Sequence, residues 1–270
     1  MAGVWENGQL FQVRSLEAAE VEHRGIRGEI TGFSRASRLR LMYLLASVDR
    51  TKVSVPIFMT LTYPGEDWER FGGRKEEVKR HLDTFHHWLA YHYPSAPAIW
   101  RLEFQERGAP HFHLLVFGVD FIDCYRTAYE WYKVVGSEQV THFEAGTQVK
   151  GCRSWAQATA YVAKYMAKLE TFAGSEVPIH SRPGRMWGVW GREFLPRELV
   201  GYALTESQFF RLRRIMRGCC KSKGYRLKPT DSFSTFIGSS TGHRALAWVG
   251  ASETDRMKDG RLPTGNEGEL

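Results

Sequence analysis

Apolar and polar residues alternate along two neighbouring segments in the middle of the chain. In residues 98–105 the even positions are apolar and the odd positions polar, and residues 111–117 repeat the pattern. A period of two is typical of half-buried β-strands. Both apolar sets reach one face of a hairpin only if even positions pair with even positions, since a slip of one residue turns every side chain over. The pattern therefore predicts an antiparallel hairpin with an odd-length loop, and a three-residue connection at 107–109 satisfies it, with Gly108 in a left-handed conformation.

The spacing of apolar residues also predicts the other elements of the chain. Helices are expected at 35–48, 75–93, 124–135, 155–170 and 206–218. Further strands are expected at 53–64, near 140–149 and within 184–196.

The two ends of the chain differ from this periodic middle part. Residues 1–33 are mixed in composition and dotted with glycine, which favours an irregular leader. Residues 251–270 are polar with few apolar side chains, and we expect a mobile tail there.

The composition restricts the class of protein. A chain of 270 residues that is 43% hydrophobic and 13% aromatic is typical of a globular protein with one large domain or two small ones. No run of eighteen apolar residues and no basic-then-apolar leader occurs, so neither a membrane span nor a secretory signal is expected. Four cysteines without CxxC spacing indicate reduced thiols and a cytoplasmic location. The net charge of +7 favours an anionic partner, first of all nucleic acid.

Two histidines stand one residue apart on the second strand of the predicted hairpin. His111 and His113 point to the same face because side chains alternate along a strand. The predicted register places Glu103 opposite His113 and Gln105 opposite His111. Glu106, the rival carboxylate, falls on the other face by parity. A solitary histidine on a strand is commonly structural, but two imidazoles and a carboxylate on one face suit a divalent metal ion, which we expect to be Mg²⁺ or Mn²⁺.

A second constellation lies in the helix expected at 155–170. Tyr161, Lys164, Tyr165 and Lys168 stand at i, i+3, i+4 and i+7, which is a single helical stripe. Such residues often decorate the exposed edge of an amphipathic helix. Alternatively, neighbouring cations and a metal-bound phosphate favour the phenolate form of tyrosine, which makes the phenols candidate nucleophiles.

These motifs together resemble the HUH endonuclease superfamily, and within it the rolling-circle replication initiators of single-stranded-DNA phages and small plasmids. Three segments match in the family's order: FMTLTYP at 58–64, EFQERGAPHFHLLVF at 103–117 and YVAKYMAK at 161–168. Residues 184–196 also resemble a segment of phage-type initiators. The resemblance implies an endonuclease domain at 34–200 with an α/β (α+β) fold, in which helices flank a central antiparallel sheet of the HUH or ferredoxin-like nucleic-acid-binding type.

The resemblance also implies an activity. Such initiators nick single-stranded origin DNA by tyrosine attack, form a 5′-phosphotyrosine intermediate with a free 3′-OH, and rejoin strands at termination. It implies Glu103, His111 and His113 as metal ligands, and Tyr165 ahead of Tyr161 as the first nucleophile. A single-tyrosine HUH transposase and a non-enzymatic DNA-binding protein remain alternatives. Because no GxxxxGK[ST] motif occurs, unwinding and synthesis would require a helicase and a polymerase of the bacterial or phage-infected host.

The expected C-terminal extension at 201–250 is rich in basic residues. Neutralisation of DNA phosphates is one interpretation of this charge, and a solvated helix face is the other. The candidate DNA-binding residues are Arg211, Arg213, Arg214, Arg217, Lys221 and Lys223.

Overall fold

The chain forms two compact units in a computed structural model. The structure describes residues 2–7, 10–15, 29–65, 67–166, 176–197, 200–222, 224, 233–235 and 239–250. The larger unit comprises Arg27–Met42 and Arg50–Pro196, and the smaller comprises Met1–Ile26, Tyr43–Asp49 and Arg197–Leu270. The larger unit thus covers most of the range 34–200.

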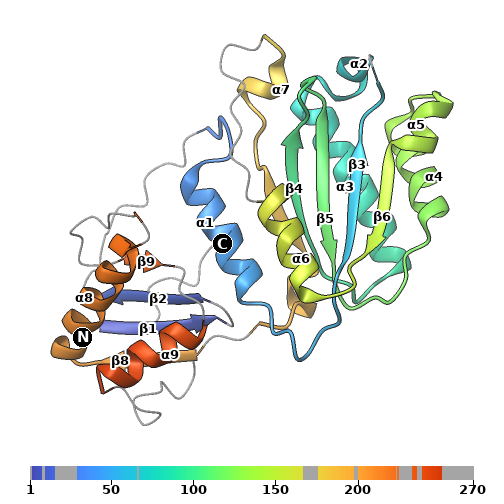
Figure 1. The fold of residues 1–270 in the computed structure, drawn as a ribbon. Coiled ribbons are helices and arrows are strands. Elements are labelled where there is room, and N and C mark those ends of the chain that lie inside the picture. Colours follow the sequence, from blue (N-terminus) through green and yellow to red (C-terminus); the bar gives the residue numbers. More distant parts are fainter. Residues whose placement is uncertain are drawn as a thin grey trace. The chain divides into compact units, whose positions relative to one another are not determined.

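A five-stranded sheet forms the centre of the larger unit (Figure 1). Its strand order is β6-β3-β5-β4-β7, and every neighbouring pair is antiparallel. The strands are β3 (Ile57–Thr62), β4 (Ala98–Phe104), β5 (Pro110–Val116), β6 (Thr147–Gly151) and β7 (Trp187–Trp190). With helices on both faces, this architecture confirms the predicted α+β fold of a central antiparallel sheet flanked by helices.

The even positions of β4 and β5 bury their side chains against two helices, α3 (Lys75–His92) and α4 (Cys124–Val135). The Phe112 ring lies 6.2 Å from Trp131 of α4, and Phe85 of α3 lies 5.8 Å from the same indole. Because this layer uses the even positions, the odd positions of the hairpin face the opposite side of the sheet.

Helix α6 (Trp155–Tyr161) and the π-helical turn η2 (Val162–Met166) cover that opposite face. The ring of Phe58 on β3 stacks on Tyr161 at a centroid distance of 4.6 Å. Ser154 caps α6 by accepting a hydrogen bond from the Gln157 backbone N–H. The helix expected at 155–170 is therefore present as far as residue 166, with a change of helix type in its second half.

The remaining elements of the larger unit are short, apart from α1 (Arg35–Ala46), whose last residues belong to the smaller unit. They are α2 (Trp68–Gly72), α5 (Val140–Ala145), α7 (Pro178–Ser181) and η3 (Arg192–Phe194). The expectation of a strand near 140–149 is wrong over its first part, which forms α5. Tertiary contacts override the local β-pattern here, because Phe143 packs on Tyr125 and Tyr132 of α4.

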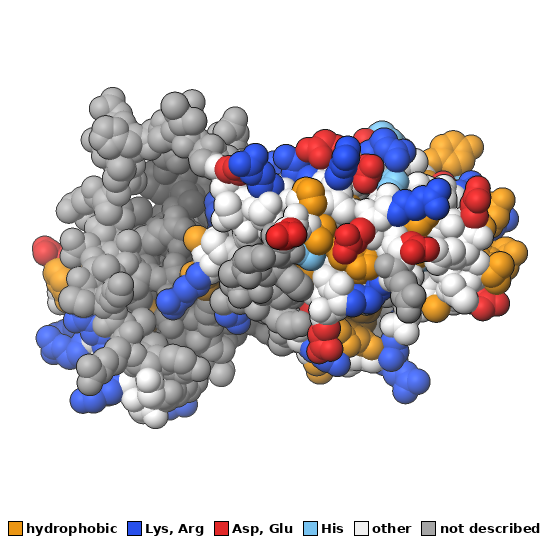
Figure 2. All heavy atoms as spheres, turned by 90° about the horizontal axis from the view of Figure 1, so that it is seen from above, with side chains coloured by type: hydrophobic (Ala, Val, Ile, Leu, Met, Phe, Trp, Pro, Cys, Tyr) orange, Lys and Arg blue, Asp and Glu red, His pale blue; other side chains and the backbone are white. Residues whose placement is uncertain are grey.

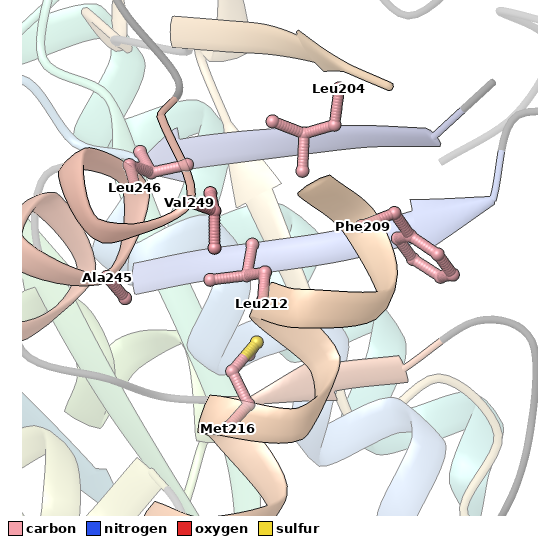
Figure 3. Close-up of a cluster of buried hydrophobic side chains, with 7 residues drawn as sticks. All are labelled: Leu204, Phe209, Leu212, Met216, Ala245, Leu246 and Val249. Atoms are coloured by element: carbon pink, nitrogen blue, oxygen red, sulfur yellow. The ribbon is translucent and has the colours of Figure 1, made fainter. Parts of the chain in front are cut away.

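The smaller unit has a four-stranded antiparallel sheet of order β8-β1-β2-β9. Its elements are β1 (Ala2–Asn7), β2 (Leu10–Ser15), β8 (Val200–Leu204), α8 (Glu206–Ser222), β9 (Phe233–Thr235) and α9 (Ser239–Trp248). Figure 3 shows the buried cluster that α8 and α9 form with β8. Its members are Leu204, Phe209, Leu212, Met216, Ala245, Leu246 and Val249.

Two strands of this sheet lie in the range 1–33, where an irregular leader was expected. Asn7-Gly8-Gln9 separates two short segments that contain apolar residues, which is a hairpin signal. The partners β8 and β9 come from the other end of the chain, so local sequence gives no sign of the sheet. The expected tail at 251–270 lies outside the described residues.

Across the described ranges, no helix combines the length and the apolar character needed to cross a membrane.

Candidate active site

The two histidines lie on β5 between β4 and β3. The observed register pairs Glu103 with His111 and Arg101 with His113, whereas the predicted register paired Glu103 with His113 and Gln105 with His111. The predicted register is therefore wrong by two residues. A shift of two preserves the face of every side chain, so Glu103 and both histidines still share the side of the sheet opposite α3 and α4.

The register differs because the hairpin loop begins one residue earlier than expected. The loop is still three residues long but comprises residues 106–108, closed by a hydrogen bond from the Gln105 N–H to the Ala109 carbonyl (3.0 Å). Gly108 has φ +85° and takes the last loop position. Three-residue hairpin loops place the left-handed residue last, so glycine decides the register.

This loop gives a first testable prediction. A Cβ on Gly108 would lie 2.8 Å from Cε1 of His180, a buried ring, and would adopt a positive φ. We expect Gly108→Ala to lower the free energy of unfolding by about 1–3 kcal/mol in urea titrations. Gly118→Ala is the matched control, since Gly118 has φ +70° but no atom closer than 4.0 Å. Equal losses for the two variants would contradict a steric role for Gly108.

Glu103 contacts His113 across the hairpin despite the shifted register. The His113 Nε2 lies 2.8 Å from Oε2 of Glu103, and both residues are buried. Diagonal neighbours on adjacent strands are within reach of long side chains, which explains how Glu103 contacts both histidine positions. The rings of His111 and His113 lie 4.5 Å apart between centroids.

His111 is held by β3 on its other side. Its Nδ1 lies 2.7 Å from the Thr62 hydroxyl, which fixes the orientation of the ring. Burial, together with the neighbouring His113, lowers the pKa of His111 to about 3. The imidazole is therefore neutral at physiological pH, which is the form that binds metal ions.

The donor set of Glu103, His111 and His113 suits a divalent cation by its chemistry. Within the described ranges, however, no three His, Cys, Asp or Glu side chains are already arranged as a metal-binding set. The direct hydrogen bond between Glu103 and His113 accounts for this at the present site, since it joins two atoms that would otherwise face the ion. The residues fit a cation that replaces this hydrogen bond. Glu106 lies in the exposed loop, away from the shared face.

The two tyrosines lie directly over the histidine face. The Tyr165 ring is 4.9 Å from the His113 ring, and the Tyr161 ring is 5.8 Å from Tyr165 and nearly parallel to it. Phe58 lies under both phenols, 4.6 Å from Tyr161 and 5.6 Å from Tyr165. A π-turn is wider than an α-turn, so η2 brings residues four apart closer to alignment along the helix axis. The structure thus brings the predicted tyrosine pair and the predicted histidine pair together.

Cations accompany both phenols. The Lys164 ammonium lies 4.8 Å from the centre of the Tyr165 ring, and a side-chain hydrogen bond to Tyr165 raises the pKa of Lys164. A charged donor on the phenol oxygen favours the phenolate. The Lys150 ammonium stands 5.7 Å from the centre of the Tyr161 ring. Lys168 lies outside the described residues.

Arg101 is a central residue of the site that the sequence pattern did not single out. It is fully buried, and its Nη1 donates to the Tyr165 backbone carbonyl (2.6 Å) and to Oε2 of Glu103 (3.5 Å). Its guanidinium also lies 4.3 Å from the centre of the Phe33 ring. The pattern indicated a polar, exposed face for the odd positions of β4. Only the covering helix, which is invisible in the local pattern, makes this arginine buried and links the carboxylate to the tyrosine turn.

This linkage gives a second prediction. Arg101→Met removes the cation beside the buried Glu103 carboxylate, and we expect it to cost about 3–5 kcal/mol of unfolding free energy in urea titrations. The double variant Arg101→Met/Glu103→Gln is expected to recover part of the loss, because no unpaired carboxylate remains. A loss below about 1 kcal/mol for the single variant would show that the ion pair is not a structural link.

The end of β3 is anchored by residues that sequence reasoning assigned to packing or did not single out. The Thr62 carbonyl accepts hydrogen bonds from Trp131 Nε1 (2.7 Å) and His142 Nε2 (2.8 Å). Arg107, in the hairpin loop, donates to the Tyr63 carbonyl (2.9 Å). These bonds hold the strand that orients His111. A paired hydrogen-bond network of this kind has no local sequence signal.

The basic residues of α8 belong to the smaller unit. Arg211, Arg214, Arg217 and Lys221 lie opposite the buried Phe209, Leu212 and Met216, and all but the half-buried Arg214 are exposed. Arg213 is buried, in contrast to the other predicted DNA-binding residues. Lys223 lies outside the described residues.

Comparison with known proteins adds one finding. Residues 56–170 match a family model described as a replication-associated protein of the ORF2 type. This match supports a replication-initiation function. The matched span includes Glu103, both histidines and both tyrosines, so it coincides with the segment that builds the site. Neither the search of curated proteins nor that of solved structures found a match.

Proposed function

We propose that the protein is a rolling-circle replication initiator of the HUH endonuclease type, which nicks and rejoins single-stranded origin DNA. The observation that carries the proposal is the position of Tyr165, whose ring lies 4.9 Å from His113 on the face that also holds Glu103 and His111. The family match over residues 56–170 supports a role in DNA replication and DNA as the partner.

In the proposed reaction a tyrosine oxygen attacks the scissile phosphorus in line. The new bond joins the phenol oxygen to the 5′ phosphate, and the bond to the 3′ oxygen breaks. The phenol proton passes to solvent, and the departing oxygen takes up a proton to become a free 3′-OH. Because the phosphodiester energy is kept in the phosphotyrosine, a 3′-OH can later reverse the step and rejoin the strand.

The chain's own residues have separate tasks in this reaction. Tyr165 is the first nucleophile and Tyr161 the second, with Lys164 and Lys168 favouring the phenolates. Glu103, His111 and His113 would hold Mg²⁺ or Mn²⁺, which would polarise the phosphoryl oxygens. Arg101 holds the Tyr165 backbone in place through the carbonyl contact.

Two alternatives differ from this proposal in what they leave unexplained. A single-tyrosine transposase would use one of the two stacked phenols, and the match to a replication-associated family favours an initiator. A non-enzymatic DNA-binding protein would need neither the histidine face nor the tyrosines above it. A host helicase and a host polymerase are the expected partners, because the 3′-OH needs extension and the chain has no nucleotide-binding GxxxxGK[ST] motif.

Covalent adduct formation tests the proposal. The protein is incubated with single-stranded DNA and Mg²⁺ or Mn²⁺, denatured, and run on a denaturing gel. We expect a slower-migrating protein–DNA band that depends on the metal and disappears with a chelator. Cleavage of DNA without any such band would indicate hydrolysis by water, and binding without cleavage would indicate a non-enzymatic module.

The basic face of α8 gives a third prediction. If Arg211, Arg214 and Arg217 neutralise phosphates, replacing all three with Gln lowers the slope of log affinity against log salt by about 0.7–0.9 for each lost contact. The measurement is a salt titration of DNA binding by fluorescence anisotropy. Arg126→Gln, an exposed arginine on α4 of the larger unit, is the control. An unchanged slope in the triple variant would leave these arginines as a solvated face.

A further inference from the structure

One surface of the larger unit carries charged side chains of a single sign. Residues 50–65 and 147–166 contain no Asp or Glu. Their charged residues are Arg50, Lys52, Lys150, Arg153 and Lys164. The face of the larger unit in Figure 2, by contrast, shows acidic and basic side chains interspersed. An all-basic surface attracts a polyanion.

The two segments meet at one end of the sheet. Ile57 pairs with Gly151 and Phe58 with Lys150, and the Cys152 N–H donates to the Pro56 carbonyl (3.3 Å). The residues that precede β3 therefore lie beside those that follow β6. This pairing brings charges that are far apart in sequence to one place.

Two of these cations stand over aromatic rings. The Arg50 guanidinium lies 4.9 Å from the centre of the Trp155 ring, and the Lys150 ammonium lies 5.7 Å from that of Tyr161. Both rings are half-buried, while Lys150 and Arg153 are exposed. Cations beside partly exposed aromatic rings are the combination by which proteins bind single-stranded nucleic acid, because the rings stack on bases and the cations contact phosphates.

The surface is continuous with the tyrosines of the candidate active site. Tyr161 ends α6, whose first residue is Trp155, and its ring stacks on Phe58. Phe58 also contacts the ring of Tyr165. A strand whose phosphate reaches the phenols would therefore have its neighbouring nucleotides beside Trp155 and Lys150.

We propose that Arg50, Lys52, Lys150, Arg153 and Trp155, here called the basic–aromatic surface, bind the single-stranded nucleotides next to the phosphate that the tyrosines attack. Trp155 stacks on a base, and the four cations contact the phosphates. A duplex presents its phosphates but not the faces of its bases, so the indole selects a single strand. The assignment to the cleaved strand rests on the proposed function, but the binding can be measured without cleavage.

The first test measures binding by the full chain with both Tyr161 and Tyr165 changed to Phe, which prevents covalent capture. The probe is a fluorescein-labelled single strand of mixed sequence, about 20 nucleotides long, followed by anisotropy. We expect Trp155→Ala to weaken binding by about 5- to 150-fold, the range for one stacked base. Trp155→Phe is expected to restore most of the affinity, because the replacement keeps an aromatic face.

The second test addresses the cations in the same background. Lys150→Ala/Arg153→Ala is expected to lower the salt slope of single-strand binding by about 1.4, which is about 0.7 for each phosphate contact. Trp88→Ala on α3 and Arg126→Ala on α4 are the matched controls, since these helices cover the opposite face of the sheet. Both controls are expected to bind like the parent, and circular dichroism checks the fold of each variant.

The outcomes separate this inference from the proposed function. Loss of binding in the surface variants, together with no covalent adduct from the unmodified chain, would keep the surface and reject the nuclease. Adduct formation by the unmodified chain, with unchanged binding by Trp155→Ala and Lys150→Ala/Arg153→Ala, would overturn the surface and keep the nuclease. Equal competition by duplex and single-stranded DNA would overturn the single-strand selectivity.

Discussion

Replacing Tyr165 with phenylalanine is expected to reduce the first covalent protein–DNA adduct to background. The variant keeps the ring that packs 4.9 Å from His113 and 5.6 Å from Phe58, and loses only the oxygen that would attack phosphorus. The fold and the DNA affinity should therefore stay close to those of the parent, while the chemistry stops. The measurement is adduct formation on a single-stranded oligonucleotide with Mn²⁺, quantified on a denaturing gel beside an anisotropy titration.

Tyr161→Phe is the matched control, because it makes the same chemical change one helical turn earlier. We expect this variant to form the first adduct but to fail to release unit-length circles in a replication assay. The second phenol is needed only after one round, when the regenerated origin is cut and the first 3′ end is joined into a circle. If Tyr161→Phe abolishes the adduct and Tyr165→Phe does not, the order of the two nucleophiles is reversed.

Changing the histidine face is expected to have the second large effect. His111→Ala, His113→Ala and Glu103→Ala should each slow nicking about 100-fold or more. A metal ion that polarises a phosphoryl oxygen contributes several kcal/mol to the transition state, and about 2.7 kcal/mol already corresponds to 100-fold in rate. Single-turnover nicking rates, measured against Mn²⁺ concentration, report this effect.

The contrasting variant is Glu106→Ala. Glu106 is only three residues from Glu103 but lies in the exposed hairpin loop, so its removal should change the nicking rate less than about threefold. Isothermal titration of Mn²⁺ into each variant adds a readout that does not depend on activity. Loss of nicking in Glu106→Ala, with normal nicking in Glu103→Ala, would show that the wrong carboxylate was assigned to the metal.

The faces of the hairpin could be predicted from sequence, but its register could not be predicted correctly from parity. Parity alone decides which side of the sheet a residue occupies, and the alternating pattern from residue 98 to residue 117 contains that parity. The register depends on where Gly108 sits in the loop, and the rule that the left-handed residue comes last distinguishes residues 106–108 from 107–109.

The stripe of Tyr161 and Tyr165 was also predictable, because residues four apart share a helical face. The π-turn at Val162–Met166 and the buried position of Arg101 were not, since both depend on how the helix lies on the sheet. Likewise, the sheet of the smaller unit pairs strands from the two ends of the chain, and local periodicity carries no signal for such long-range pairing.

The most direct test of the central claim is to locate the covalent bond. The adduct formed with single-stranded DNA and Mn²⁺ is digested with nuclease and protease, and the modified peptide is sequenced by mass spectrometry. We predict a nucleotide joined through its 5′ phosphate to Tyr165, with Tyr161 modified when Tyr165 is phenylalanine. A nucleotide on neither tyrosine would contradict the nucleophile assignment and, with it, the proposed mechanism.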